Sequence, residues 1–270
     1  MKFKDKVVLV TGAARGIGAE TARQFAAQGA HLVLADIDGA AAAELAGSLV
    51  GAGTQAAGVR CDITDPAEIA RLRSLVLERV GRIDVLVNNA AAQQFGPGGI
   101  DTLDLERYRQ SFEVNLLGAV RMVDAFLPTM LEQRQGYIVN TSSSLAIRPN
   151  PVVGHLMPYV ASKGAVLTWT YALACAVRDR GIGVSLFCPG LTATRADAPT
   201  IPQRHGWFAR TPEALATPGT LHDCAAALLD GLREERFLIS SEPDYAKALL
   251  DFAGARLDPM HFSTMPAQPA

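Results

Sequence analysis

The amino-acid sequence predicts a single α/β domain: a doubly wound, parallel seven-stranded sheet with helices on both faces. Three observations predict it. Seven short apolar runs alternate with longer helical patterns, which is typical of parallel strands joined by right-handed crossovers. The first run, at positions 7–10, has only apolar residues, as expected of a strand buried on both faces. No linker or repeat divides the 270 residues, a length that suits one large domain.

The elements follow one another in a regular order. Strands are expected at 7–10, 31–35, 56–60, 84–87, 137–140, 183–187 and 237–239. Helices are expected at about 17–28, 39–49, from 66, at about 103–133, and around 159 to about 180. Pro66 suits a helix start, and Gly118 and Pro128 are expected to interrupt the long helix. Residues from about 192 to 218 are expected to form a substrate loop, and the chain from about 259 an irregular tail.

The composition excludes several classes of protein. With 49% hydrophobic residues, 19% charged residues and a net charge of −2, the chain offers no basic surface for nucleic acid or an anionic membrane. No signal-type segment and no uncharged run of membrane-spanning length is apparent, so a cytoplasmic protein is expected. The four cysteines lack metal-ligand or CxxC spacing, which predicts free, mostly buried thiols and no metal site.

A glycine-rich turn lies between the first strand and the first helix. Its sequence, TGAARGIG over 11–18, has the spacing GxxxGxG. Glycines there permit a tight turn and let a pyrophosphate approach the backbone at a helix N-terminus. An ordinary βα turn is the alternative, but the position after the first strand favours a Rossmann-like nucleotide site. The candidate cofactor-binding residues are Gly12, Arg15, Gly16, Ile17 and Gly18.

Asp36 ends the second strand, about 20 residues beyond the glycine turn. A carboxylate at this position can accept both ribose hydroxyls of NAD and repels the 2′-phosphate of NADP. Ile37 offers no positive charge to offset that repulsion, whereas Arg15 is within reach of such a phosphate. Asp36 as a simple loop or cap residue is the alternative. We expect NAD, with NADP less favoured.

The segment YVASK places Tyr159 and Lys163 four residues apart, on one face of a helix. A free tyrosine has a pKa of ~10, and a nearby cation lowers it towards the range useful for proton transfer. A lowering by ~3 units requires ~4 kcal/mol. That is more than one lysine is expected to supply, so a second positive charge should lie nearby.

The ordered set of motifs resembles the short-chain dehydrogenase/reductase family over roughly residues 5 to 240. Besides the glycine turn and YVASK, the set contains Asp62, NNAA at 88–91, Asn115, the pair Ser142 and Ser143, and Pro189-Gly190. The resemblance implies an NAD-dependent oxidoreductase that interconverts a secondary alcohol and a ketone on a mainly apolar small molecule. It also implies a homotetramer.

The resemblance assigns a role to each matching position. Tyr159 would be the general acid or base, Lys163 would lower the pKa of Tyr159 and hold the nicotinamide ribose, and Ser143 would bond the substrate oxygen. Asn115 would hold a water through its backbone at a helix irregularity. Asp62 would bond the adenine amino group and Thr192 the carboxamide. The remaining cofactor contacts would be Ile63, Asn89, Ala90, Pro189 and Gly190.

Some alternatives stay open. Ser142 or Ser144 is a rival to Ser143, and Asn115, Asp62 and Thr192 each have an ordinary local role as an alternative. Ala91 replaces the usual glycine of NNAG, which tightens that turn if it needs a positive φ. The 143–159 stretch is longer than usual. The side chains expected to face substrate are mainly apolar, among them Ile147, Leu156, Leu191, Trp207 and Phe208, with His155 as a surface-loop histidine or a substrate contact.

Two other functions compete with the dehydrogenase. A non-catalytic NAD(H)-binding sensor or scaffold would need the glycine turn but not the set of Asn115, Ser143, Tyr159 and Lys163. A cofactor-free dehalogenase on the same fold would have little use for the glycine turn, Asp36 or Lys163. The intact set therefore favours the oxidoreductase.

Overall fold

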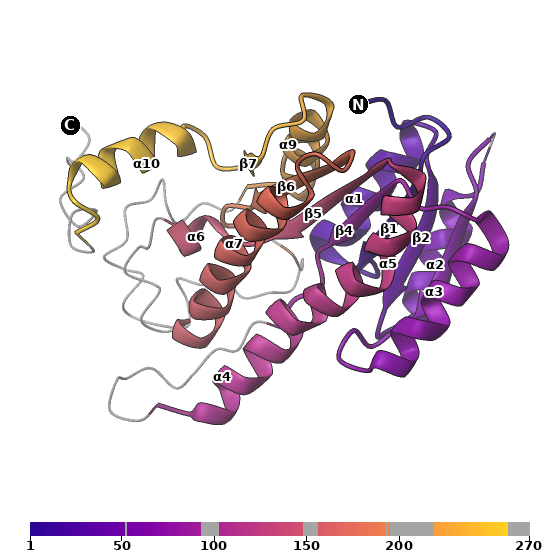
Figure 1. The fold of residues 1–270 in the computed structure, drawn as a ribbon, viewed down its shortest axis with the longest axis horizontal. Helices are drawn as coiled ribbons and strands as arrows, with labels where there is room; N and C mark the ends of the chain where they lie inside the picture. Colours follow the sequence, from indigo (N-terminus) through magenta and orange to yellow (C-terminus); the bar gives the residue numbers. More distant parts are fainter. Residues whose placement is uncertain (52, 93–102, 148–155, 193, 195–218, 259–270) are drawn as a thin grey trace.

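The computed structural model describes residues 1–51, 53–92, 103–147, 156–192, 194 and 219–258. Seven strands form one all-parallel sheet in the order β3-β2-β1-β4-β5-β6-β7, which confirms the predicted fold class (Figure 1). The strands are β1 (Val7–Thr11), β2 (His31–Asp36), β3 (Ala56–Arg60), β4 (Val85–Asn88), β5 (Gly136–Thr141), β6 (Ile182–Cys188) and β7 (Leu238–Ser240).

The strand order reverses at β1, which lies between β2 and β4. In such sheets ligands bind beyond the carboxyl ends of the strands, at the point of reversal. Several of the predicted site residues lie at or just beyond those ends. Strands β1, β2, β4, β5 and β6 end at Thr11, Asp36, Asn88, Thr141 and Cys188, respectively.

Helices cover both faces of the sheet. One apolar core lies under α1 (Gly16–Ala27), α2 (Gly39–Leu49) and α9 (Leu221–Arg233). The opposite core lies under α3 (Pro66–Val80), α5 (Ala119–Gln133) and α7 (Met157–Val177). Two short helices, α6 (Ser144–Ile147) and α10 (Tyr245–Gly254), lie at the β6–β7 end of the molecule (Figure 1).

Helices α9 and α10 are not among the predicted elements. The sequence does contain a signal for α9. Thr220 caps this helix by accepting a hydrogen bond from Asp223 N, and the buried residues of α9 recur at helical spacing. For α10 the signal is poor: its N-cap, Asp244, has left-handed backbone dihedrals and makes no side-chain cap.

The long helix expected over 103–133 is three consecutive segments: α4 (Leu105–Phe112), the π-helical turn η1 (Glu113–Gly118) and α5. The expected interruption at Pro128 is wrong, since α5 continues through it. The burial of Phe126 and Met130 on either side offsets the one hydrogen bond that proline removes. Gly118 serves close packing, because an added Cβ would lie 2.5 Å from Ile63 Cδ1.

Within the described ranges, two helical stretches are long and apolar enough to cross a membrane by length and composition, Leu105–Gln133 and Met157–Val177. Core helices of soluble proteins pass the same test, and both stretches pack here on the sheet and on each other. Only 33% of the apolar window of Met157–Val177 is buried, so much of α7 is at least partly exposed outside the core.

Candidate active site

The glycine turn follows β1 and opens α1. Gly12 and Gly16 have φ values of +63° and +58°, a region that other residues rarely adopt. A Cβ on Gly12 would lie 2.7 Å from Ala90 Cα, and a Cβ on Gly18 would lie 2.2 Å from Gly12 O. Any larger residue at these positions would therefore push the turn away from its neighbours.

The turn after β4 is joined to the glycine turn by hydrogen bonds. Asn89 Nδ2 donates to the carbonyl oxygens of Thr11 and Gly12 at 3.0 and 3.1 Å. Thr11 Oγ1 accepts from the backbone N–H groups of Asn89 and Ala90 at 3.0 and 3.1 Å. Ala91 is not among the described residues with positive φ, so its Cβ is accommodated without backbone strain.

The N-terminus of α1 is suited to an anion. Its N-cap, Arg15, makes no side-chain cap and the first turn contains no acidic residue. The first N–H groups of a helix have no partner within the helix, and the helix dipole adds partial positive charge there. Together with the glycines, this arrangement fits the pyrophosphate of a dinucleotide.

Asp36 is buried at the end of β2, next to the glycine turn. Its carboxylate accepts from Ala14 N and from Asp38 N, both at 2.9 Å. Arg15 forms an ion pair with Asp38 at 2.7 Å, and both side chains are exposed. The positive charge of Arg15 is therefore partly balanced by Asp38, through a solvent-exposed ion pair.

The remaining cofactor candidates fall into two groups. Asp62 accepts hydrogen bonds from the backbone and the hydroxyl of Thr64, as in a turn, while the Ile63 side chain is buried in the core. After β6, Pro189 O accepts from Ser144 N, Gly190 N donates to Ser241 Oγ, and Thr192 Oγ1 donates to Gly190 O. Any contact of Ile63 with a cofactor would come from its backbone.

Tyr159 and Lys163 lie on the first turns of α7, with Lys163 Nζ 5.8 Å from the centroid of the Tyr159 ring. The expected lowering of the Tyr159 pKa is wrong for the chain by itself. Burial raises the pKa of Tyr159 to about 12, and a hydrogen bond with Ser143 only partly opposes it. The Lys163 ammonium donates a hydrogen bond to Thr141 O at 2.7 Å.

Lys163 is 1% exposed, and burial lowers its pKa from 10.5 to about 8. Its ammonium group donates a hydrogen bond to the Thr141 carbonyl and is paired with no carboxylate among the described residues. A buried cation without a counterion is costly, which is typical of a functional position.

Of the three consecutive serines, Ser143 is the one that contacts Tyr159. Ser142 Oγ donates to Lys163 O at 2.8 Å and so ties β5 to α7. Ser144 begins α6, and its carbonyl accepts from Tyr245 Oη at 2.8 Å. The geometry therefore separates Ser143 from its two rivals.

Asn115 lies in the π-helical turn, the kind of helix irregularity expected at this position, and is buried. Its side chain accepts from Ala92 N at 2.7 Å and donates to Ala92 O at 3.1 Å and to Ser162 Oγ at 2.9 Å. Ser162 Oγ in turn donates to Tyr159 O at 2.7 Å. The Asn115 side chain is thus fully used in joining three segments.

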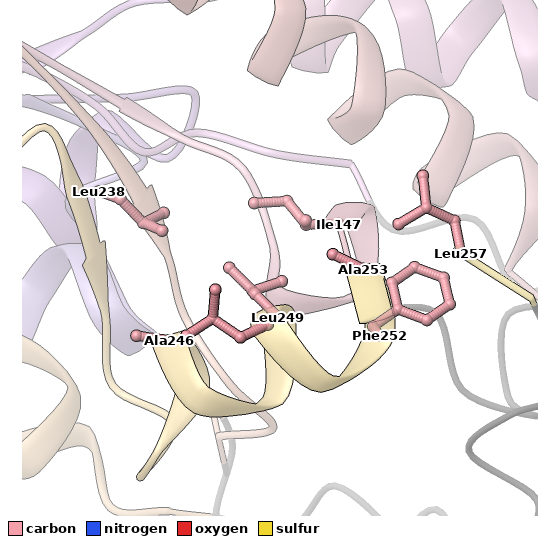
Figure 2. Close-up of a pocket in the computed structure, with 8 residues that line it drawn as sticks. Ile147, Leu238, Ala246, Leu249, Phe252, Ala253 and Leu257 are labelled. Atoms are coloured by element: carbon pink, nitrogen blue, oxygen red, sulfur yellow. The ribbon is translucent and has the colours of Figure 1, made fainter. Parts of the chain in front are cut away.

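An apolar groove of about 480 Å³ lies beside α6, between that helix, β7 and α10 (Figure 2). Tyr245 holds α10 to the backbone of Ser144, the residue after Ser143. Leu250 and Leu257 are 74% and 60% exposed, so the groove is open to solvent. Its lining is wholly apolar: Ile147, Leu238, Ala246, Leu249, Leu250, Phe252, Ala253 and Leu257.

Of the side chains expected to face substrate, Ile147 lines this groove, Leu156 is buried and Leu191 is 37% exposed. His155, Trp207 and Phe208 lie outside the described residues, as does most of the expected substrate loop. Within the described ranges, no group of three or more His, Cys, Asp or Glu side chains could hold a metal ion. Cys61, Cys188 and Cys224 are free and buried, whereas Cys175 is exposed.

Sequence reasoning assigned no role to several residues of this region. Cys188 is a buried thiol whose pKa burial raises to about 12, and it bonds the Ser142 side chain and the Ser143 backbone. Ser162, inside YVASK, links Asn115 to Tyr159. Tyr245, far along the chain, had no local sequence signal.

The chain belongs to the short-chain dehydrogenase family, whose model matches residues 6–205. It is 36% identical to a 1-deoxy-11-beta-hydroxypentalenate dehydrogenase from Streptomyces exfoliatus over 93% of this chain and 88% of that protein. It is 39% identical to a galactitol 2-dehydrogenase from Agrobacterium fabrum over 71% of this chain and 72% of that protein.

A solved structure has the same architecture. The short-chain dehydrogenase/reductase from Burkholderia phymatum in complex with NAD superposes with a TM-score of 0.80 and 28% sequence identity. The match covers 100% of this chain and 99% of that one. These similarities, together with the site, make the chain an oxidoreductase of the short-chain dehydrogenase type.

Proposed function

We propose that this protein is an NAD-dependent oxidoreductase that interconverts a secondary alcohol and a ketone on a mainly apolar small molecule. The observation that carries the proposal is the meeting of Ser143, Tyr159 and Lys163 near the carboxyl ends of β5 and β6, on the same sheet edge as an uncapped glycine-rich helix N-terminus. A protein that only senses NAD(H) has no need of that catalytic group.

In the proposed reaction, the Tyr159 hydroxyl protonates the ketone oxygen during reduction, and its phenolate accepts the hydroxyl proton during oxidation. Ser143 bonds the same substrate oxygen and so fixes it beside Tyr159. The nicotinamide, when bound, supplies or accepts the hydride and contributes a positive charge in its oxidised form. Lys163 would hold the nicotinamide ribose, and the backbone of Asn115 would hold a water.

The balance of charges at the end of β2 supports NAD over NADP. Asp36 presents a carboxylate beside the glycine turn, and Asp38 adds a second one that pairs with Arg15. A 2′-phosphate would meet two carboxylates and no unpaired cation among the described residues here. Ribose hydroxyls, by contrast, can donate to the free lone pairs of Asp36.

Cofactor binding tests this proposal directly. The wild-type protein is expected to bind NADH at least ten times more tightly than NADPH in a fluorescence titration. Asp36→Asn should weaken NADH binding by about tenfold, the range expected for loss of a charge-assisted hydrogen bond. Asp38→Asn keeps a good helix cap but releases Arg15, and should strengthen NADPH binding while leaving NADH binding nearly unchanged.

The outcomes separate the alternatives. Tighter binding of NADPH by the wild type would mean that Arg15 outweighs the two carboxylates. Tight NADH binding without oxidation of any alcohol in a broad panel would favour the sensor. If neither nucleotide bound, the dehydrogenase proposal would be wrong.

The apolar groove supports an apolar substrate. Its wall includes Ile147, one helical turn after Ser143, and its lining offers no charge to bind an anionic group (Figure 2). Apolar surface buried there would contribute about 0.8 kcal/mol per methylene, roughly a fourfold gain in kcat/KM for each added carbon. We propose that the part of the substrate remote from the carbinol lies in this groove.

A series of 2-alkanols of increasing length checks this placement. The kcat/KM of the wild type should rise with chain length. Ala253→Phe, which fills the groove, should lower kcat/KM at least tenfold for the longest alcohols and less than threefold for the shortest. Lys247→Phe adds the same bulk to α10 at an exposed position outside the groove and should leave the series unchanged. Equal sensitivity of short and long alcohols to Ala253→Phe would contradict the placement.

We further propose a cytoplasmic homotetramer. The surface of α7 supports an oligomer, since this long apolar helix is only partly buried and Tyr171 on it is 51% exposed. A partly exposed apolar helix offers a surface on which a second copy of the chain could pack.

A further inference from the structure

Thr141 carries a buried hydroxyl that the proposed mechanism does not use. The residue ends β5 and is 7% exposed. Its Oγ1 is one of five buried side-chain atoms that have no hydrogen-bond partner in the described part of the chain. Buried hydroxyls are normally paired, and an unpaired one costs folding free energy, so each exception calls for an explanation.

The position of Thr141 distinguishes it from the other four atoms, which belong to Thr21, Asn88, Ser111 and Arg121. The backbone carbonyl of Thr141 accepts the hydrogen bond from Lys163 Nζ at 2.7 Å. The next two residues are Ser142, bonded to Lys163 O, and Ser143, bonded to Tyr159. The unpaired hydroxyl therefore belongs to the residue that holds the Lys163 ammonium group.

Strand alternation gives the direction of the side chain. Tyr137 and Val139 lie in the core beneath α1 and α9, and Thr141 continues the same face one step further, at the carboxyl edge of the sheet. Asn140 faces the other way and bonds Thr170 of α7. Thr141 thus faces the side of the sheet on which α1 begins at the glycine turn.

We propose that the Thr141 hydroxyl is a cofactor contact: it hydrogen-bonds the ribose of the nicotinamide half, the sugar that Lys163 holds. The inference rests on the proposed function, because it requires a bound dinucleotide. A ribose offers hydroxyls that both donate and accept, which would satisfy Oγ1. The hydroxyl is then unpaired in the free protein and paired in the complex, so its desolvation cost is recovered on binding.

The test combines apoprotein stability with nucleotide affinity. Thr141→Val keeps the shape and removes the hydroxyl. It should weaken NADH binding about five- to tenfold and leave the melting temperature of the apoprotein equal or higher. Thr141→Ser, which keeps the hydroxyl, should bind NADH like the wild type. AMP, which lacks the nicotinamide ribose, should bind to the wild type and to Thr141→Val equally well.

Thr21→Val is the matched control. It removes another unpaired, buried threonine hydroxyl, in α1, and should leave NADH affinity unchanged. Wild-type NADH affinity in Thr141→Val would overturn the inference while leaving the dehydrogenase proposal intact. A fall in the melting temperature of Thr141→Val apoprotein would also overturn it, because the hydroxyl would then be structural. Failure of the wild type to bind NADH or NADPH would overturn both proposals.

Discussion

Tyr159→Phe is expected to lower kcat for oxidation of a secondary alcohol by about a thousandfold, within the range that a positioned acid or base contributes. The substitution removes the proton-transferring hydroxyl and keeps the ring over which Lys163 Nζ lies at 5.8 Å. NADH affinity, measured by fluorescence titration, should therefore stay within about threefold of the wild type, a change of less than 1 kcal/mol. Steady-state kinetics with any alcohol that the wild type is confirmed to oxidise measure the fall in kcat.

Tyr171→Phe is the control, because Tyr171 lies on the same helix, is 51% exposed and contacts the Phe237 ring outside the site. Its kcat should match the wild type. The rate of the wild-type enzyme should also rise with pH in the oxidation direction, because burial holds the pKa of Tyr159 above its ordinary value and the phenolate is the active form. Near wild-type turnover by Tyr159→Phe would disprove the assigned role.

Lys163→Met should have opposite effects on activity and on stability. The buried ammonium has a pKa of about 8 in the folded protein instead of 10.5. This difference lowers the stability of the folded protein by about 3 kcal/mol at pH 7. Methionine removes that penalty and loses the bond from the charged ammonium to Thr141 O, worth about 2 kcal/mol. The apoprotein should therefore melt about two degrees higher at pH 7, while kcat/KM falls at least a hundredfold.

The pH dependence of this gain has a defined sign. Below pH 8 the lysine is charged in both states and the penalty on the wild type is complete. Between pH 8 and 10.5 the folded form loses its proton first, so wild-type stability rises with pH and the advantage of Lys163→Met shrinks. Thermal melts of both apoproteins at pH 7 and pH 9.5 measure the difference. A gap that widened with pH would contradict the assigned burial of a charged lysine.

The sheet was predictable because each strand contains a short run of mainly apolar residues between turn or helix patterns. All seven strands are found, and their ends differ from the predicted ones by at most one residue. Asp84, for example, was expected to start the fourth strand and instead lies just before β4, where its carboxylate accepts from Val7 N. Strand ends depend on such side-chain contacts between distant segments, which local patterns do not contain.

The candidate site was predictable where chemistry demands a fixed spacing. The glycines, Asp36 and the pair Tyr159 and Lys163 are positions of this kind, and the structure brings them to the sheet edge where parallel strands end. The direction of the Tyr159 pKa was not predictable in the same way, because burial outweighs the neighbouring cation. Burial is a property of the packed molecule.

The residues that were missed act over long sequence separations. Tyr245 bonds the backbone of Ser144, a hundred and one positions earlier in the chain. Ser162 accepts a hydrogen bond from the Asn115 side chain, 47 positions earlier in the chain. Neither pairing leaves a local pattern, because a single tyrosine or serine in a helix has many ordinary uses.

The bonds between Asn89, Thr11 and Gly12 have a consequence for binding kinetics. These hydrogen bonds join the glycine turn to the turn after β4 and hold both in place without any ligand. The conformational entropy of these two turns is therefore lost when the chain folds, not when a nucleotide arrives. Association with turns held in this way needs no ordering step, so its rate should be set by diffusion and orientation. Differences in affinity among related nucleotides should then appear mainly in their dissociation rate constants.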